Sequence, residues 1–187
     1  YNFSNQQDEA ITILEKFIFK KHSDTESLLD IYLSLIMFYF QKNELNKATK
    51  LFSKFYNTDK WYTEKAGIEW TIKKNLIEIL LHIELKHIDF FESRLLSFKR
   101  HYFGYLKSIK QQRVITFLSL VEDYYKKPEI ITTKEFNTKV ESSFEWIEAK
   151  REDIFVMSFY AWLKSKMENK PLFETTLSLI EQAQNVN

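Results

Sequence analysis

Residues 29–55 read LDIYLSLIMFYFQKNELNKATKLFSKF, and this stretch decides the fold. Its apolar side chains recur every three or four positions on both sides of a polar turn at Lys42 and Asn43. That spacing is typical of amphipathic helices, which place residues three and four apart on the same face. The stretch therefore predicts two helices, at residues 26–41 and 44–56, joined by a short turn.

Helical spacing continues along the rest of the chain. With the first two, it predicts nine helices, and the other seven are expected at residues 6–20, 62–85, 89–102, 106–125, 133–150, 152–168 and 171–183. Pro128 ends one of them, because proline disfavours helical geometry in the residue before it. Pro171 opens the last, since proline fits the first helical turn. Gly104 is expected to mark a break between two helices or a close helix contact.

Composition supports long helices joined by short polar turns. Among 187 residues there are two glycines and two prolines, and 44% of the chain is hydrophobic. β-Sandwiches and doubly wound α/β folds need many tight turns, where glycine supplies positive φ. Two glycines argue against both folds, and they exclude the glycine-rich loops that hold dinucleotides and phosphates. The fold is therefore expected to be all-α.

Charge and cysteine content narrow the partners and cofactors. The net charge is +1, whereas nucleic-acid-binding domains usually carry a clear basic excess, so a nucleic-acid partner is not expected. The chain has no cysteine, which excludes disulfides and thiolate metal sites, and no cofactor is expected. The longest apolar run, residues 31–40, is shorter than the ~20 residues of a membrane span. The expected compartment is the cytoplasm, unless a signal sequence precedes Tyr1.

A helix-pair pattern recurs along the chain. Residues 8–17 align with residues 46–55. Five anchors of the pattern step by 38, 43, 45 and 39 residues, and they are Ala10, Ala48, Phe91, Phe136 and Thr175. Repeats of this length indicate a helical solenoid, in which each helix pair buries its apolar face against its neighbours.

The second copy of this pattern resembles the tetratricopeptide repeat. The positions that match that family's spacing are Tyr32, Leu35, Ile36, Tyr39, Asn43, Leu45, Ala48 and Phe52. Tyr32 stands where the family has tryptophan, Ile36 where it has glycine, and Asp59 and Lys60 where it has a closing proline. The resemblance is good over residues 29–55 and thin elsewhere, so another kind of α-solenoid is the alternative. It implies a right-handed superhelix of antiparallel helix pairs, forming a single domain over residues 1–187.

The register of the repeat has a consequence for the first helix. Residues 6–20 match the second helix of a repeat, and no partner helix precedes them. Ile11 and Ile18, together with Leu14 and Phe17, make this helix apolar around much of its surface. We therefore expect the chain to be part of a longer protein that continues upstream, or this face to dock on another molecule.

The resemblance also implies which residues line a binding groove. In tetratricopeptide arrays the first helix of each pair lines the concave face. By register, the groove-lining residues are Asp30, Leu33, Met37, Phe40, Lys73, Leu76, Leu80, Met157, Tyr160 and Lys164.

Groupings suited to catalysis or metal binding are weak. His82, Glu84 and His87 come nearest to a metal cluster, but two histidines on one helix face need a spacing of four. Their spacing of five would turn the two imidazoles ~140° apart on a continuous helix. Carboxylates also gather, at Glu122, Asp123, Glu148, Glu152 and Asp153. Adjacent residues on a helix do not converge on one point, so solvated faces are the favoured interpretation. No metal site and no catalytic residue are predicted.

The densest basic stretch lies between residues 99 and 113. It combines Lys99, Arg100, His101, Lys107, Lys110 and Arg113 with the aromatic Phe98, Tyr102, Phe103 and Tyr105. Basic residues with stacking aromatics bind single-stranded nucleic acid. The favoured interpretation is a helix corner with core aromatics and solvated lysines. The large aromatics are likewise expected mostly in the core, namely Trp61, Tyr62, Trp70, Trp146, Tyr160 and Trp162.

These observations predict a non-enzymatic scaffold or adaptor that binds a protein or peptide in a helical-repeat groove. Three alternatives stay open. They are a sensory or regulatory segment of a larger protein, such as one with a DNA-binding head, a surface or periplasmic repeat protein in complex assembly, and an enzyme with a site built from scattered residues. Abundant lysine, isoleucine, asparagine and phenylalanine suggest a bacterial, AT-rich source.

Overall fold

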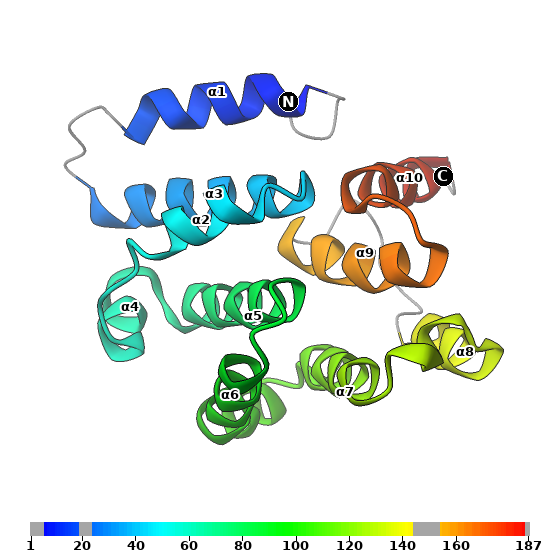
Figure 1. Ribbon diagram of the computed structural model, residues 1–187. Helices are drawn as coiled ribbons and strands as arrows, with labels where there is room; N and C mark the ends of the chain where they lie inside the picture. The colour runs from blue at the N-terminus through cyan, green and yellow to red at the C-terminus, as the bar shows by residue number, and fades with distance from the viewer. Residues whose placement is uncertain (1–5, 19–23, 144–153, 186–187) are drawn as a thin grey trace. The chain divides into compact units, whose positions relative to one another are not determined.

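The computed structural model describes residues 6–18, 24–143 and 154–185, with side chains from 158 to 182 in the last range (Figure 1). This part of the chain is all-helical and contains no strand. Its elements are α1 (Gln7–Ile18), α2 (Thr25–Gln41), α3 (Leu45–Phe52), α4 (Asp59–Ala66), α5 (Ile68–Glu84), α6 (Ile88–Ser108), α7 (Gln112–Lys126), the short 3₁₀ helix η2 (Pro128–Thr132), α8 (Lys134–Ser143), α9 (Ile154–Glu168) and α10 (Leu172–Asn185). The all-α prediction is confirmed.

The chain divides into two compact units, Tyr1–Phe98 and Lys99–Asn187. In the first unit α2 packs against α1, α3, α4 and α5, and α4 packs along α5. In the second unit α7 packs against η2, α8 and α9, and α9 packs against α10. Several helices adjacent in sequence thus pack as neighbouring pairs in both units, namely α1–α2, α2–α3, α4–α5, α7–α8 and α9–α10. All five anchors of the sequence repeat are buried, from Ala10 to Thr175.

The predicted helix at residues 62–85 is wrong in one respect, because the structure divides this region at Gly67. This residue has φ +89° and ψ 160°, a conformation that side chains with a Cβ rarely adopt. The helix before the break, α4, also begins earlier than expected, at Asp59, where the hydroxyl of Thr58 accepts a hydrogen bond from the Trp61 amide. One predicted helix is therefore two, and the described part of the chain holds ten α-helices rather than the nine expected.

Gly104 shows the opposite outcome, because α6 continues through it to Ser108. On the buried face of α6, Phe98, Tyr102 and Leu106 keep the helical spacing on both sides of the glycine. The chain turns away just after the end of this helix, at Lys110, which has φ 59°. The Gln111 amide there donates to the Leu106 carbonyl at 2.8 Å.

This helix ending recurs at four places. Asn43, Lys86, Lys110 and Asn169 all have φ between 52° and 59°. In each case the amide of the following residue donates back to a carbonyl five positions earlier, as in the Schellman motif. Asparagine and lysine thus fill positions that glycine usually occupies, which explains how a chain with two glycines makes so many short helix connections.

The two glycines predict opposite effects of the same substitution. Gly67→Ala should lower the free energy of unfolding by about 1 to 2 kcal/mol, because alanine is strained at positive φ. Gly104→Ala should raise it by about 0.5 to 1 kcal/mol, because helical alanine is favoured over glycine and an added Cβ at this site meets no atom within 4 Å. Urea unfolding followed by circular dichroism measures both, and effects of the same sign would contradict this explanation.

Candidate functional site

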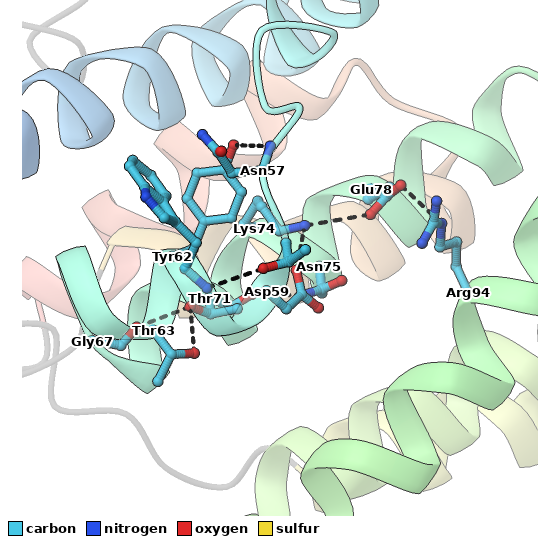
Figure 2. A network of polar contacts seen from close by, with 12 residues as sticks. Asn57, Asp59, Tyr62, Thr63, Gly67, Thr71, Lys74, Asn75, Glu78 and Arg94 are labelled. Carbon is cyan, nitrogen blue, oxygen red and sulfur yellow. Dashed lines mark hydrogen bonds and ion pairs between the residues drawn. The ribbon is translucent and has the colours of Figure 1, made fainter.

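The densest group of buried polar side chains in the described residues lies on α5. Thr71, Lys74, Asn75 and Glu78 are all buried, although each carries a group that normally needs water or a partner. They recur at helical spacing, so they share one face of α5. Figure 2 shows this face and the side chains of α4 and α6 that meet it.

Asp59, in the first turn of α4, contacts two of these residues. Its carboxylate lies 2.9 Å from the Lys74 Nζ, and its other oxygen accepts a hydrogen bond of 2.9 Å from the Asn75 amide (Figure 2). The same amide donates to the Thr71 carbonyl. Thr71 in turn accepts a hydrogen bond from the Thr63 hydroxyl at 3.1 Å. These contacts fasten α4 to α5 along their shared length.

Aromatic rings enclose the Lys74 ammonium. Its Nζ lies 5.6 Å from the ring centre of Tyr62 and 5.8 Å from that of Phe52. Tyr62 stacks on Trp70 with ring centres 5.3 Å apart, and Phe55 packs edge-on against both rings. The negative faces of aromatic rings attract cations. The buried lysine is therefore stabilised by π-systems as well as by a carboxylate.

Glu78 connects this network to α6. Its carboxylate lies 3.0 Å from the Arg94 Nε and 3.8 Å from the Lys74 Nζ. Burial raises the pKa of Glu78 above its ordinary value, and the positive charges of Lys74 and Arg94 partly oppose that effect. Three helices, α4, α5 and α6, thus meet in one chain of charges running from Asp59 to Arg94.

Arg94→Gln should lower the free energy of unfolding by about 0.5 to 1 kcal/mol at pH 7, since the guanidinium is half exposed and its attraction is screened. The loss should shrink as the pH falls through the folded-state pKa of Glu78, because a protonated Glu78 no longer attracts Arg94. Urea unfolding at several pH values checks this. Arg100→Gln, which removes an exposed arginine elsewhere on α6, is the control, and an equal loss at every pH would contradict the pairing.

Beyond Glu78, whose carboxylate lies 4.0 Å from the His82 Nε2, the network reaches an exposed corner between α5 and α6. His82 stacks on Phe90 with ring centres 5.3 Å apart, and its centre lies 5.8 Å from that of His87. Burial lowers the pKa of His82, and the nearby His87 and Arg94 lower it further. Ile88 and Phe90 are 57% and 60% exposed. This group, His82, His87, Ile88 and Phe90, is called the α5–α6 corner below.

The relative geometry of His82 and His87 in this corner differs from the one expected from their spacing. A spacing of five residues turns two rings ~140° apart only where one helix is continuous. Instead α5 ends at Glu84 and the chain turns at Lys86, which has φ 57°, so the rings approach each other. Within the residues that the structure describes, no three His, Cys, Asp or Glu side chains are grouped so as to hold a metal ion.

The predicted groove residues occupy different environments. Six are buried, namely Leu33, Met37, Phe40, Leu76, Leu80 and Tyr160. Asp30 is exposed, while Lys73 and Lys164 are partly buried. The Met157 side chain lies outside the described residues. The Tyr160 hydroxyl donates to the Glu141 carboxylate at 2.9 Å, and Lys164 pairs with Glu141 and Glu168.

The other residues that the sequence singled out are mostly structural. Glu122 pairs with Lys99 and Lys126, and Asp123 pairs with Lys139. Of the large aromatics, the buried ones are Tyr62, Trp70, Tyr160 and Trp162. Trp61 is half buried. Residues Trp146, Glu148, Glu152 and Asp153 lie outside the described residues.

Sequence reasoning missed the polar network, although a signal for it was present. Positions 71, 74, 75 and 78 form a polar stripe within the apolar segment 70–81. A polar stripe on a helix ordinarily faces solvent. Here α4 folds back over it and Arg94 approaches from α6, so the stripe is internal.

Comparison with known proteins finds no matching family model, no similar curated protein and no similar solved structure. No helix in the described ranges is long and apolar enough to cross a membrane.

Proposed function

We propose that this chain is a helical-repeat interaction module, without enzymatic activity, that binds a protein or peptide segment. Its fold would be a right-handed superhelix of the tetratricopeptide class. Helices that pack as sequence neighbours and buried repeat anchors from Ala10 to Thr175 support this proposal. The resemblance over residues 29–55 supports it as well.

One observation carries the binding function, and it is the α5–α6 corner. Ile88 and Phe90 are large apolar side chains that remain more than half exposed, while α5 beside them is buried on nearly all sides. Exposed aromatic side chains that are held in place serve as anchors in protein interfaces. Phe90 is held by its stacking on His82, and α6 is fastened to α5 by the ion pair between Glu78 and Arg94.

The test is affinity capture with the full chain from a lysate of the source organism, followed by mass spectrometry. The wild-type chain should enrich a specific protein, and the double variant Ile88→Ala, Phe90→Ala should lose most of it. Tyr56→Ala removes an aromatic side chain that is 85% exposed elsewhere in the same unit, so it serves as the matched control and should retain the partner. Failure of the wild-type chain to enrich any protein would refute the function.

A further inference from the structure

Positive charge is concentrated in one stretch of this nearly neutral chain. Residues 93–121 contain no aspartate or glutamate, and they carry six lysines and arginines as well as His101. The net charge of the whole chain is only +1. The acids that balance these cations therefore lie elsewhere in the sequence. Two of them reach this stretch, since Glu78 pairs with Arg94 and Glu122 pairs with Lys99.

Three cations of this stretch are available to a ligand outside the chain. Arg100, Lys107 and Lys110 are exposed, and none of them has an ion pair among the described residues. Their neighbour Lys99 differs, because its Nζ lies 2.5 Å from the Glu122 carboxylate. Arg100 and Lys107 are seven residues apart on α6, which places them on one face, about 10 Å apart along the helix axis. We call these three residues the basic corner.

The helix surface between Arg100 and Lys107 is open. Gly104 lies there on the same face of α6, is exposed, and has no atom within 4 Å of the position where a Cβ would be. Neither a positive φ nor internal packing requires a glycine at this position. A partner chain crossing α6 at Gly104 can approach the helix backbone closely and place acidic side chains between the two cations.

We propose that the basic corner binds an acidic segment of a partner protein. This inference rests on the proposed function, and it names the chemistry of the partner. Carboxylates from the segment pair with Arg100 and Lys107, and the arginine can hold one in a two-pronged contact. Ile109, which is exposed beside Lys110, offers an apolar contact at the edge of the surface.

Two other anionic partners fit this surface less well. Single-stranded nucleic acid binds through exposed aromatic rings that stack on bases, whereas Tyr102 is buried and Phe103 and Tyr105 are half buried. Binding to an anionic membrane is favoured by about 1 kcal/mol per basic residue, and firmer binding draws on apolar side chains that insert. Among described residues of the second unit, Ile109 is the one large hydrophobic side chain that is exposed.

The test measures binding of fluorescein-labelled poly-L-glutamate to the full chain by fluorescence anisotropy at low salt. The triple variant Arg100→Gln, Lys107→Gln, Lys110→Gln should bind about tenfold more weakly than wild type, because the charge contacts dominate. The control triple variant Lys50→Gln, Lys60→Gln, Lys65→Gln removes the same charge from exposed lysines of the first unit and should bind within about twofold of wild type. Circular dichroism confirms that both variants are folded.

Several results would overturn the proposal. Absence of poly-L-glutamate binding, or equal weakening in both triple variants, would show that the basic corner is not a specific site. Tighter binding of a single-stranded oligonucleotide or of phosphatidylserine vesicles, lost in the first triple variant, would assign the surface to another partner. The capture experiment separates this inference from the proposed function. A partner enriched equally by wild type and by the first triple variant refutes the basic corner alone.

Discussion

Replacing Trp162 with alanine should lower the free energy of unfolding by about 3 to 5 kcal/mol. Trp162 is 1% exposed and lies on α9, which packs against both α7 and α10. Its ring packs edge-on against Tyr124 with centres 5.8 Å apart. Alanine would leave a cavity the size of an indole, which the surrounding helices cannot close without moving.

Thermal unfolding followed by circular dichroism measures this effect, and the midpoint should fall by on the order of 10 °C. Trp61→Ala is the matched control, because Trp61 is only half buried and contacts Tyr62 at its side. We expect the control to cost about 1 to 2 kcal/mol, since less apolar surface is lost. Equal effects of the two substitutions would contradict the placement of Trp162 in the core.

Asp59→Ala should lower the free energy of unfolding by about 2 to 3 kcal/mol. The substitution leaves the Lys74 ammonium, whose side chain is 7% exposed, with Glu78 at 3.8 Å as its remaining ion-pair partner among the described residues. It also removes an acceptor from the buried Asn75 amide. Asp59 itself is 41% exposed, so water offsets part of the loss and the cost stays below that of a fully buried pair.

A double-mutant cycle tests this explanation. Lys74→Met keeps the apolar stem and removes the charge, so in the Asp59→Ala background it should restore stability to within about 1 kcal/mol of wild type. Asp30→Ala, which removes an exposed carboxylate from α2, should change stability by less than about 0.5 kcal/mol and serves as the control. A double variant less stable than Asp59→Ala alone would show that the buried charge is not the cause.

Helical periodicity was sufficient to predict most helices, because each buries an apolar face and the spacing of that face is local information. It could not distinguish the two glycines. Both follow good helical patterns, yet Gly67 divides a helix and Gly104 does not. The difference comes from contacts between residues eight apart, since Tyr62 stacks on Trp70 with ring centres at 5.3 Å. In a straight helix such residues would be about 12 Å apart along the axis.

The candidate site was predicted less well than the fold. The polar stripe of α5 is visible in the sequence, but its environment depends on α4 folding back over it, which the helical pattern does not encode. The α5–α6 corner depends on the turn at Lys86, where a lysine adopts a positive-φ conformation that is usually predicted only where the sequence has glycine. The basic corner is different. Its charges are apparent in the sequence, and the structure adds that Arg100, Lys107 and Lys110 are exposed and form no ion pair with any residue of the described ranges.

The contacts of Asp59 also determine how α4 aligns along α5. Apolar side chains tolerate sliding, because one ring or methyl group can replace another at a similar energy. Ion pairs and hydrogen bonds do not tolerate sliding, because each joins particular atoms. Moving α4 by one helical turn, about 5.4 Å, would separate Asp59 from both the Lys74 ammonium and the Asn75 amide. Apolar packing alone would allow several alignments of α4 along α5, and the contacts of this single carboxylate select one of them.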